Sequence, residues 1–297
     1  MQTVKEQALL LGPRRSLVAV VSSAVRPSVA NDAPTVVILN SGIVHRVGPN
    51  RMSVILARAL AAIGFTAVRF DLSGIGDSEP RPDSLPPLEA GLADVREALD
   101  SLAASRGTQR FILAGLCSGA DLSVVYAGSD PRVVGAVIID PTIPHTLRHW
   151  LHYYKNRLTR AESWINIVRG QNPFWLAMKR RFRRTASAEE PAIRELTADD
   201  PEVRGFLERA YVNAVDRRVR LLAVLTGVLQ SYREELLDAF PAARFGDLLR
   251  LEYLKDADHL FHDPTARARL IDVIVHWAVS TDFGGAGERA GERKVVR

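Results

Sequence analysis

Residues 111–120 read Phe-Ile-Leu-Ala-Gly-Leu-Cys-Ser-Gly-Ala. The aliphatic start of this stretch predicts a buried strand, and the residues from Ala120 onward predict a helix. Gly115 and Gly119 lie two residues before and two residues after Cys117. Glycines at this spacing permit a strained turn that projects the central side chain above a sheet. Such a turn commonly carries a serine nucleophile, so we expect Cys117 to be a nucleophile in its place.

Two other interpretations of these residues are less favourable. A lone cysteine is more commonly a small buried hydrophobe, but the flanking glycines and the strand and helix on either side argue against that role for Cys117. Ser118 lies one residue beyond the apex of the turn and lacks the glycine spacing. We therefore expect Ser118 to contribute its backbone N–H rather than its hydroxyl.

Short aliphatic runs alternate with helical segments along most of the chain. The first two runs flank Gly12 and Pro13, which predicts an antiparallel hairpin. Repeated strand and helix units follow, and they imply a parallel sheet with helices on both faces. We therefore predict an α/β fold with a mostly parallel eight-stranded sheet. The expected strands are residues 8–11, 17–22, 36–39, 67–70, 111–114, 133–139, 220–225 and 249–254, and the expected helices are residues 51–63, 88–104, 120–127, 232–240 and 266–279.

The strand rhythm stops between residues 144 and 217, where the chain becomes helical, aromatic and basic. We expect this segment to be an inserted helical cap on a core formed by residues 1–143 and 218–283, followed by a disordered tail at residues 284–297. Residues 148–184 contain ten Lys or Arg against one acid, a charge of +9 that leaves −4 for the remainder. A nucleic-acid surface and a solvated helical face are the alternative interpretations of this charge, and we expect no nucleic-acid partner.

A nucleophile at such a turn needs a base, which in the α/β-hydrolase fold that this turn resembles follows the last strand. His259 follows the strand expected at residues 249–254 and is the predicted base. His262 is a weaker alternative, and His276 lies inside the closing helix. The remaining histidines lie in other segments: His45, His145, His149 and His152. Their spacing suggests no metal site.

The acid that orients the base is not at the position where the α/β-hydrolase fold usually has it. It normally follows the strand expected at residues 220–225, but residues 226–231 contain no carboxylate, and Glu234 and Glu235 are the next candidates. Asp140 ends the strand at residues 133–139, at the same edge of the sheet, and is slightly favoured. Its alternative role is a turn or cap before Pro141. A thiol, with an ordinary pKa of about 8.5, depends less on such an acid than a hydroxyl does.

Acyl transfer also requires N–H donors for the oxyanion. We expect these from the backbone of Ser118 and of Ile43, because Ile43 follows Gly42 in the loop after the strand at residues 36–39. The turn at residues 69–78 carries two glycines in a G-x-G spacing but no third, so it is not a dinucleotide site. No cofactor is expected.

Residues 4–279 together resemble α/β-hydrolases of the serine-aminopeptidase-like superfamily. More narrowly, residues 40–49 and 148–170 resemble exosortase-associated and natural-product-cluster hydrolases, which commonly pair a cysteine elbow with an Asp-His loop. The resemblance implies an α/β-hydrolase fold with a cap, and a thioesterase, acyltransferase or cyclase acting on a hydrophobic thioester or ester in natural-product or polymer biosynthesis. The alternatives are a small-molecule esterase or lactone hydrolase, and a catalytically silent binding protein.

The composition bears on the compartment and on the partners of the protein. The 297 residues are 47% hydrophobic and include one cysteine, which cannot form an intrachain disulfide. The first residues do not have the pattern of a secretory leader, and no apolar run reaches the roughly 18 residues that cross a bilayer, so the expectation is a cytoplasmic protein without a leader and without integral membrane contact. The basic segment, with Arg180, Arg181, Arg183 and Arg184, is the predicted dock for an acyl-carrier protein.

Overall fold

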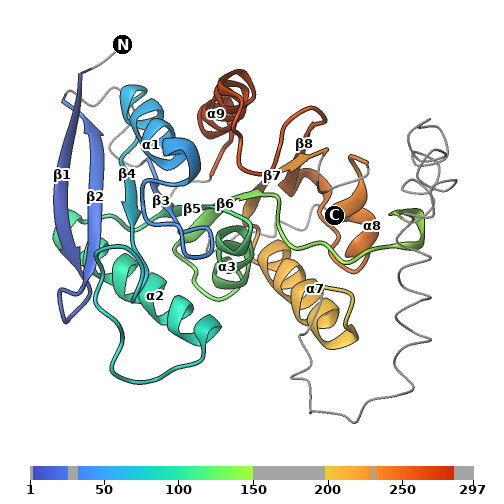
Figure 1. Ribbon diagram of the computed structural model, residues 1–297, viewed down its shortest axis with the longest axis horizontal. Helices are drawn as coiled ribbons and strands as arrows, with labels where there is room; N and C mark the ends of the chain where they lie inside the picture. Colours follow the sequence, from blue (N-terminus) through green and yellow to red (C-terminus); the bar gives the residue numbers. More distant parts are fainter. Residues whose placement is uncertain (1–2, 26–32, 150–197, 228, 230–231, 284–297) are drawn as a thin grey trace, which may run out of the picture.

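The computed structural model describes residues 3–25, 33–149, 198–227, 229 and 232–283 (Figure 1). The described strands form one eight-stranded sheet in the order β1-β2-β4-β3-β5-β6-β7-β8. β1 pairs antiparallel with β2, and β2 pairs antiparallel with β4, while β4, β3, β5, β6, β7 and β8 are parallel. The predicted mostly parallel sheet is therefore confirmed. The strands are β1 (Val4–Leu11), β2 (Leu17–Ala24), β3 (Thr35–Ile38), β4 (Ala67–Phe70), β5 (Phe111–Leu116), β6 (Val133–Ile139), β7 (Arg220–Thr226) and β8 (Leu249–Leu254).

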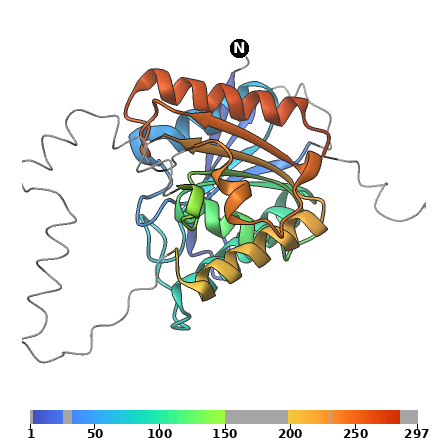
Figure 2. The ribbon, with the colours of Figure 1, turned by 90° about the vertical axis from the view of Figure 1, so that its right-hand side faces the viewer.

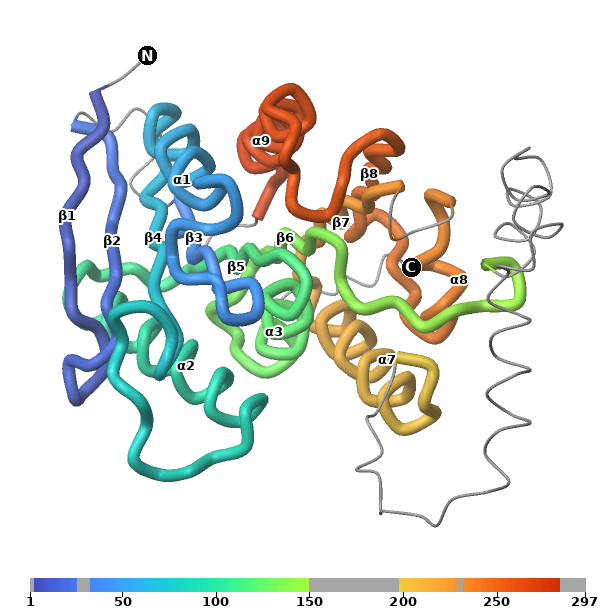
Figure 3. Tube along the Cα trace, in the orientation of Figure 1, coloured from blue at the N-terminus to red at the C-terminus, as the bar shows by residue number. Residues whose placement is uncertain are grey.

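Helices cover both faces of the sheet, as Figures 1 and 2 show. α1 and α9 lie on one face, and α2, α3 and α7 lie on the other. The tube in Figure 3 shows the same arrangement along the chain: α1 follows β3 on one face, α2, α3 and α7 follow on the other, and α9 returns to the face of α1. None of the described helices combines the length and the apolar character needed to cross a membrane. The helices are α1 (Met52–Ala62), α2 (Pro87–Arg106), α3 (Ser118–Ala127), α7 (Pro201–Asp216), α8 (Glu235–Ala239) and α9 (Pro264–Ser280), with 3-10 turns at Pro49–Arg51 and Gly246–Leu248.

The central strands are apolar on both sides because both faces of the sheet are covered. In β5, Phe111 and Leu113 join the core cluster beneath α2, α3 and α7, whereas Ile112 and Leu116 join the cluster beneath α1 and α9. Successive side chains of a strand point to opposite faces, so one aliphatic run fills two cores. This explains why residues 111–114 are a continuous hydrophobic run rather than an alternating one.

The segment expected to form the cap ends in a helix of the core. α7 packs against α3, and its buried residues Leu207, Tyr211 and Ala214 belong to the core cluster on that face. A crossover between the parallel strands β6 and β7 needs such a helix, so the expected cap boundary at residue 217 lies too late. The rest of the expected cap, residues 150–197, lies outside the described residues, as does the expected tail.

Because β3, β4, β5, β6, β7 and β8 are parallel, the loops that follow them meet at one edge of the sheet. Ligand sites of open α/β sheets lie at this carboxyl edge. Here it gathers the loop after β3, the turn after β5, Asp140 after β6 and the segment after β8 that contains His259. The candidate functional residues therefore meet at one edge although Ile43 and His259 are 216 positions apart in the sequence.

Candidate active site

Cys117 lies at the apex of a strained turn between β5 and α3. Its φ of 56° and ψ of −123° lie outside the ordinary regions for a non-glycine residue, and its N–H donates to the Ile139 carbonyl at 2.9 Å. A Cβ at Gly115 would collide with the backbone of Gly119, and a Cβ at Gly119 would collide with the Asn40 carbonyl. Both glycines are therefore required by close approach of the backbone, which is the turn that the spacing predicted.

The surroundings of the Cys117 thiol favour its protonated form. The side chain is half-buried and packs against the apolar cluster beneath α1 and α9. Burial is the main reason that the pKa of the thiol lies above its ordinary value; the carboxylates of Asp121 and Asp140 add to the rise, and a hydrogen bond to the Ser118 backbone opposes it. A neutral thiol is a poor nucleophile, so reaction at Cys117 requires a neighbouring base.

The predicted base and acid lie together. His259 Nδ1 is 3.0 Å from Asp140 Oδ2, within the distance of about 3.2 Å expected of a hydrogen-bonded pair. The Asp140 side chain is buried, and a quarter of the His259 side chain is exposed. An ionised carboxylate only accepts hydrogen bonds, so Nδ1 carries the hydrogen, and Nε2 is left to accept a proton. This is the arrangement that a general base needs.

Thr226 holds the Asp140 carboxylate from the neighbouring strand. Its backbone N–H donates to Oδ1 at 2.7 Å, and its hydroxyl donates to Oδ2 at 2.7 Å. Thr226 is the last residue of β7, the strand after which the acid of this arrangement is normally found. A carboxylate was expected after this strand, but its last residue is a threonine that supports the carboxylate of the neighbouring strand.

The alternative acids and the alternative base have other partners. Glu235 is buried, and its carboxylate accepts a hydrogen bond from the ring of His149. Glu234 precedes α8, and its carbonyl accepts from the helix backbone. His262 Nδ1 lies 2.9 Å from Asp258 Oδ1, and two thirds of its side chain is exposed. The geometry therefore favours His259 and Asp140 over these residues.

One buried side chain and three hydrogen bonds fix the loop that contains His259. Phe261 is fully buried, with a φ of 52°. The Asp258 carboxylate accepts the N–H groups of Leu260 and His262, each at 3.0 Å. Asn50, in the loop before α1, donates its side-chain amide to the Leu260 carbonyl at 2.9 Å. The histidine loop is thus tied both to the core and to the loop after β3.

The loop after β3 presents a different N–H from the one predicted. Gly42, not Ile43, donates to the elbow: its N–H lies 2.8 Å from Ser118 Oγ. Residues 41–44 form a turn in which the Val44 N–H donates to the Ser41 carbonyl at 3.0 Å, and the Ile43 side chain is 93% exposed on its outer side. The Gly42 N–H, which faces the elbow, is therefore a candidate donor in addition to that of Ile43, whose expected role stays a prediction.

Buried polar groups hold this loop in place. Asn40 donates to the Val44 carbonyl at 2.8 Å and accepts the Leu72 N–H at 2.7 Å. The buried Asp71 carboxylate forms an ion pair with Arg46. Asp71 lies in the turn after β4, at residues 69–78, and its position after a neighbouring parallel strand was the signal for this contact.

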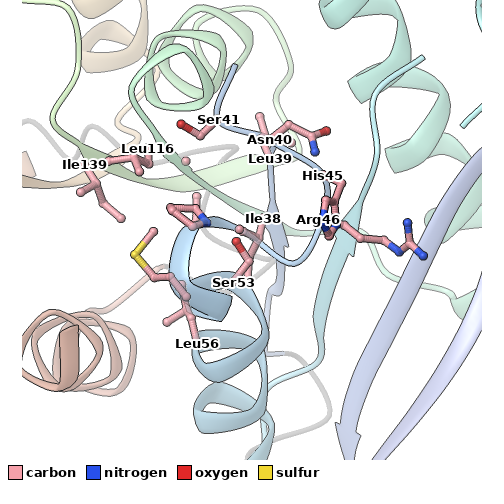
Figure 4. A pocket seen from close by; sticks show the side chains of 15 residues that line it. Ile38, Leu39, Asn40, Ser41, His45, Arg46, Ser53, Leu56, Leu116 and Ile139 are labelled. Carbon is pink, nitrogen blue, oxygen red and sulfur yellow. The ribbon is translucent and has the colours of Figure 1, made fainter. Parts of the chain in front are cut away.

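An apolar cavity lies beside the elbow (Figure 4). It is lined by Leu116, which precedes Cys117, and by Ile38, Met52, Leu56 and Ile139, with Ser41 among the polar lining residues. The five apolar residues belong to the cluster against which Cys117 packs. An aliphatic group bound near Cys117 would therefore find apolar surface here.

The family model described as serine aminopeptidase, S33, matches residues 32–264. The chain belongs to the S33 family. Three solved structures with this fold illustrate the likeness. A hypothetical protein from Pseudomonas aeruginosa matches with a TM-score of 0.55 and 14% identity over 94% of this chain and 93% of its own. An esterase from Pyrococcus furiosus matches with a TM-score of 0.54 and 12% identity over 93% and 90%. An α/β serine hydrolase homologue from Coxiella burnetii matches with a TM-score of 0.54 and 15% identity over 93% and 97%.

These structures show that this S33-family chain has the α/β-hydrolase fold. A search of curated protein sequences found no significant match. Where the family name specifies serine, the elbow of this member carries Cys117, with Ser118 one residue beyond it.

Proposed function

We propose that this S33-family chain is a cysteine-nucleophile acyl-transfer enzyme of the thioesterase, acyltransferase or cyclase type. Its proposed substrate is a hydrophobic thioester or ester. The observation that carries the proposal is the placement of the strained Cys117 and of the His259–Asp140 pair, with its 3.0 Å contact, at one edge of the sheet.

In the proposed reaction the Cys117 sulfur attacks the acyl carbonyl carbon while His259 Nε2 takes the thiol proton. The carbonyl electron pair moves onto oxygen, and the tetrahedral intermediate then expels the leaving thiolate or alkoxide, which receives the proton from His259. Water or a nucleophile of the substrate attacks the acyl-enzyme with His259 as base, and Cys117 leaves as the thiol. Asp140 keeps the histidine oriented and stabilises the imidazolium.

The backbone N–H groups of Ser118 and Gly42 are the proposed oxyanion donors. In the free site the Gly42 N–H is occupied by Ser118 Oγ at 2.8 Å. A substrate oxygen would replace this exposed hydroxyl, so the donor is already oriented before substrate binds. Ser118 therefore contributes its N–H to the oxyanion, and its hydroxyl holds the loop that contains Gly42 in the orientation that substrate binding requires.

The cavity beside Leu116 and Ile139 is small, and its apolar walls support a hydrophobic group close to the acyl carbonyl. The setting in natural-product or polymer biosynthesis rests on the resemblance at residues 40–49 and 148–170. Docking of an acyl-carrier protein is proposed from the charge of the basic segment; Arg180, Arg181, Arg183 and Arg184 lie outside the described residues. An esterase or lactone hydrolase would use the same residues and differ in its leaving group.

Mass spectrometry of the intact protein tests the proposal. Wild type is mixed with acetyl and octanoyl thioesters of N-acetylcysteamine, with the matching p-nitrophenyl esters, and with a δ-lactone. We expect an acyl adduct that maps to Cys117 or turnover of the thioester, and neither in Cys117→Ala. Cys117→Ser should retain part of the activity because the turn survives. If no compound acylates wild type or is turned over, the enzyme proposal is wrong.

The raised thiol pKa of Cys117 is the observation that favours a catalytically silent binding protein instead. In that case the octanoyl compounds would bind without release of thiol or p-nitrophenolate. Isothermal titration with the non-reactive octanoyl amide measures this binding directly. Binding of equal strength to wild type and Cys117→Ala, without turnover by wild type, would establish the binding role.

A further inference from the structure

We propose that Thr226 is a positioning residue that allows the acid of the triad to come from β6 instead of β7. Thr226 occupies the strand end at which the acid is normally found, and it uses its N–H and hydroxyl to aim Asp140 at His259. This inference deepens the proposed function and rests on it. It gives the absence of a carboxylate after β7 a physical explanation.

The register of the two strands brings Asp140 and Thr226 together. β6 and β7 are parallel neighbours with Ile139 opposite Val224, and the Asp140 N–H continues the ladder by donating to the Val224 carbonyl at 2.9 Å. Thr226 therefore stands just beyond Asp140 on the adjacent strand. From there it reaches both carboxylate oxygens, each at 2.7 Å.

This contact determines which way the carboxylate faces. Oδ2 accepts both the Thr226 hydroxyl at 2.7 Å and His259 Nδ1 at 3.0 Å, while Oδ1 accepts the Thr226 N–H. A carboxylate held at both oxygens by one residue cannot rotate about its terminal bond without losing a hydrogen bond. Charge-assisted hydrogen bonds of this kind are also the strong ones, so the orientation is well fixed.

The backbone of Asp140 shows why such support is needed. Asp140 has a φ of 43° and precedes Pro141, which restricts the conformations open to the residue before it. Its side chain is fully buried, and a buried carboxylate without partners is costly. Asp140 thus stands in a strained turn with a buried charge, and Thr226 supplies two of its partners.

A second threonine offers a matched control. Thr142 donates its N–H to Asp121 Oδ1 at 2.9 Å and its hydroxyl to Asp121 Oδ2 at 2.6 Å. Thr142 lies two residues after Asp140, and it holds Asp121 with the same two hydrogen bonds that Thr226 makes to Asp140. The carboxylate that contacts His259 is that of Asp140. Removing the Thr142 hydroxyl therefore controls for the general loss of a threonine–carboxylate bond near the elbow.

The experiment compares Thr226→Val, Thr226→Ser and Thr142→Val in the full chain. The first readout is the rate constant for acylation of Cys117 by saturating p-nitrophenyl acetate. Thr226→Val should lower it by about 10-fold to 100-fold, as loss of a supporting hydrogen bond to a site residue does, with KM little changed. Thr226→Ser should restore it to within about 3-fold of wild type, and Thr142→Val should stay within about 3-fold.

The second readout needs no substrate. Crystal structures of the three variants give the distance from Asp140 Oδ2 to His259 Nδ1, and we expect this contact to be lost only in Thr226→Val. Retention of the contact and of the acylation rate in Thr226→Val overturns the inference. If wild type is never acylated but the contact changes as expected, the proposed function fails and the positioning role of Thr226 stands. If Thr226→Val does not fold, Thr226→Ala is measured against Thr226→Ser in its place.

Discussion

His259 and His262 lie three residues apart, yet their environments assign them different roles. His259 has a buried carboxylate partner at 3.0 Å, whereas His262 pairs with the surface residue Asp258. We expect His259→Ala to lower kcat/KM by about 10³-fold or more, since it removes the proton acceptor. His262→Ala should stay within about 3-fold of wild type. Steady-state kinetics with an acyl compound that the mass-spectrometry experiment identifies as a substrate measures both, and the reverse pattern would move the base to His262.

The raised pKa of Cys117 predicts a thiol that is protonated at neutral pH. Alkylation by iodoacetamide, which needs the thiolate, should therefore rise with pH and reach half its maximum rate above about 8.5, the ordinary value for cysteine. Burial is the main cause, and the Asp121 carboxylate contributes. Asp121→Asn should thus shift the midpoint to lower pH. Intact-mass time courses between about pH 6 and pH 11 give the midpoint; a wild-type midpoint below about 7 would reveal a cysteine–histidine ion pair instead.

At the level of elements, the buried strands were predictable and the hydrogen bonds between them were not. The aliphatic runs at residues 133–139 and 220–225 have a hydrophobic content that only a covered strand explains. The shared carboxyl edge then made Asp140 a candidate before its distance to His259 was known. The support from Thr226 depends on strand register, and the N–H of Gly42 depends on the conformation of one turn. Neither the strand register nor the turn conformation can be predicted from the residue pattern of a single sequence.

The loop before α1 connects two parts of the site. Asn50 has a φ of 49° and a ψ of 31°, a left-handed conformation that asparagine and glycine tolerate, and its amide holds the Leu260 carbonyl next to His259. Asn50→Gly removes the amide and suits the backbone, whereas Asn50→Ala removes the amide and strains the backbone. Both variants should slow acylation of Cys117 by a similar factor of about 3 to 10, since both lose the anchor.

Stability should separate the two Asn50 variants. Asn50→Ala should lose about 1 kcal/mol of unfolding free energy relative to Asn50→Gly, because only alanine is strained at this φ. Urea denaturation measures this difference. If Asn50→Gly reacts as fast as wild type, the contact between the two loops has no part in catalysis.

Across the whole molecule, one acidic residue adds side-chain bonds between the N-terminal hairpin and the parallel part of the sheet, beside the β2–β4 ladder. The Glu6 carboxylate on β1 accepts from Arg58 Nε of α1 at 3.1 Å, from Ser22 of β2 at 3.0 Å and from Arg69 of β4 at 3.3 Å. Hydrogen bonding to Arg58 is the main reason that the pKa of Glu6 falls from 4.5 to about 2. One side chain therefore links the edge of the sheet to the helix whose start lines the cavity beside the elbow.

Acid should weaken this connection in a defined interval. The folded-state pKa of Glu6 lies below its unfolded value, so its contribution to stability is fully present above about pH 4.5 and is lost as the pH falls toward about 2. Half of the Arg58 side chain is exposed, and solvent screening limits the contribution at neutral pH to on the order of 1 kcal/mol.

We expect Glu6→Gln to lose that amount at pH 7 and to show a shallower decline of unfolding free energy below pH 4.5 than wild type. Urea denaturation across this range tests it, with Glu79→Gln, whose side chain is 74% exposed, as the control. Parallel acid profiles for Glu6→Gln and wild type would show that the network adds nothing, and the attachment of the hairpin would then rest on the β2–β4 ladder and on apolar packing alone.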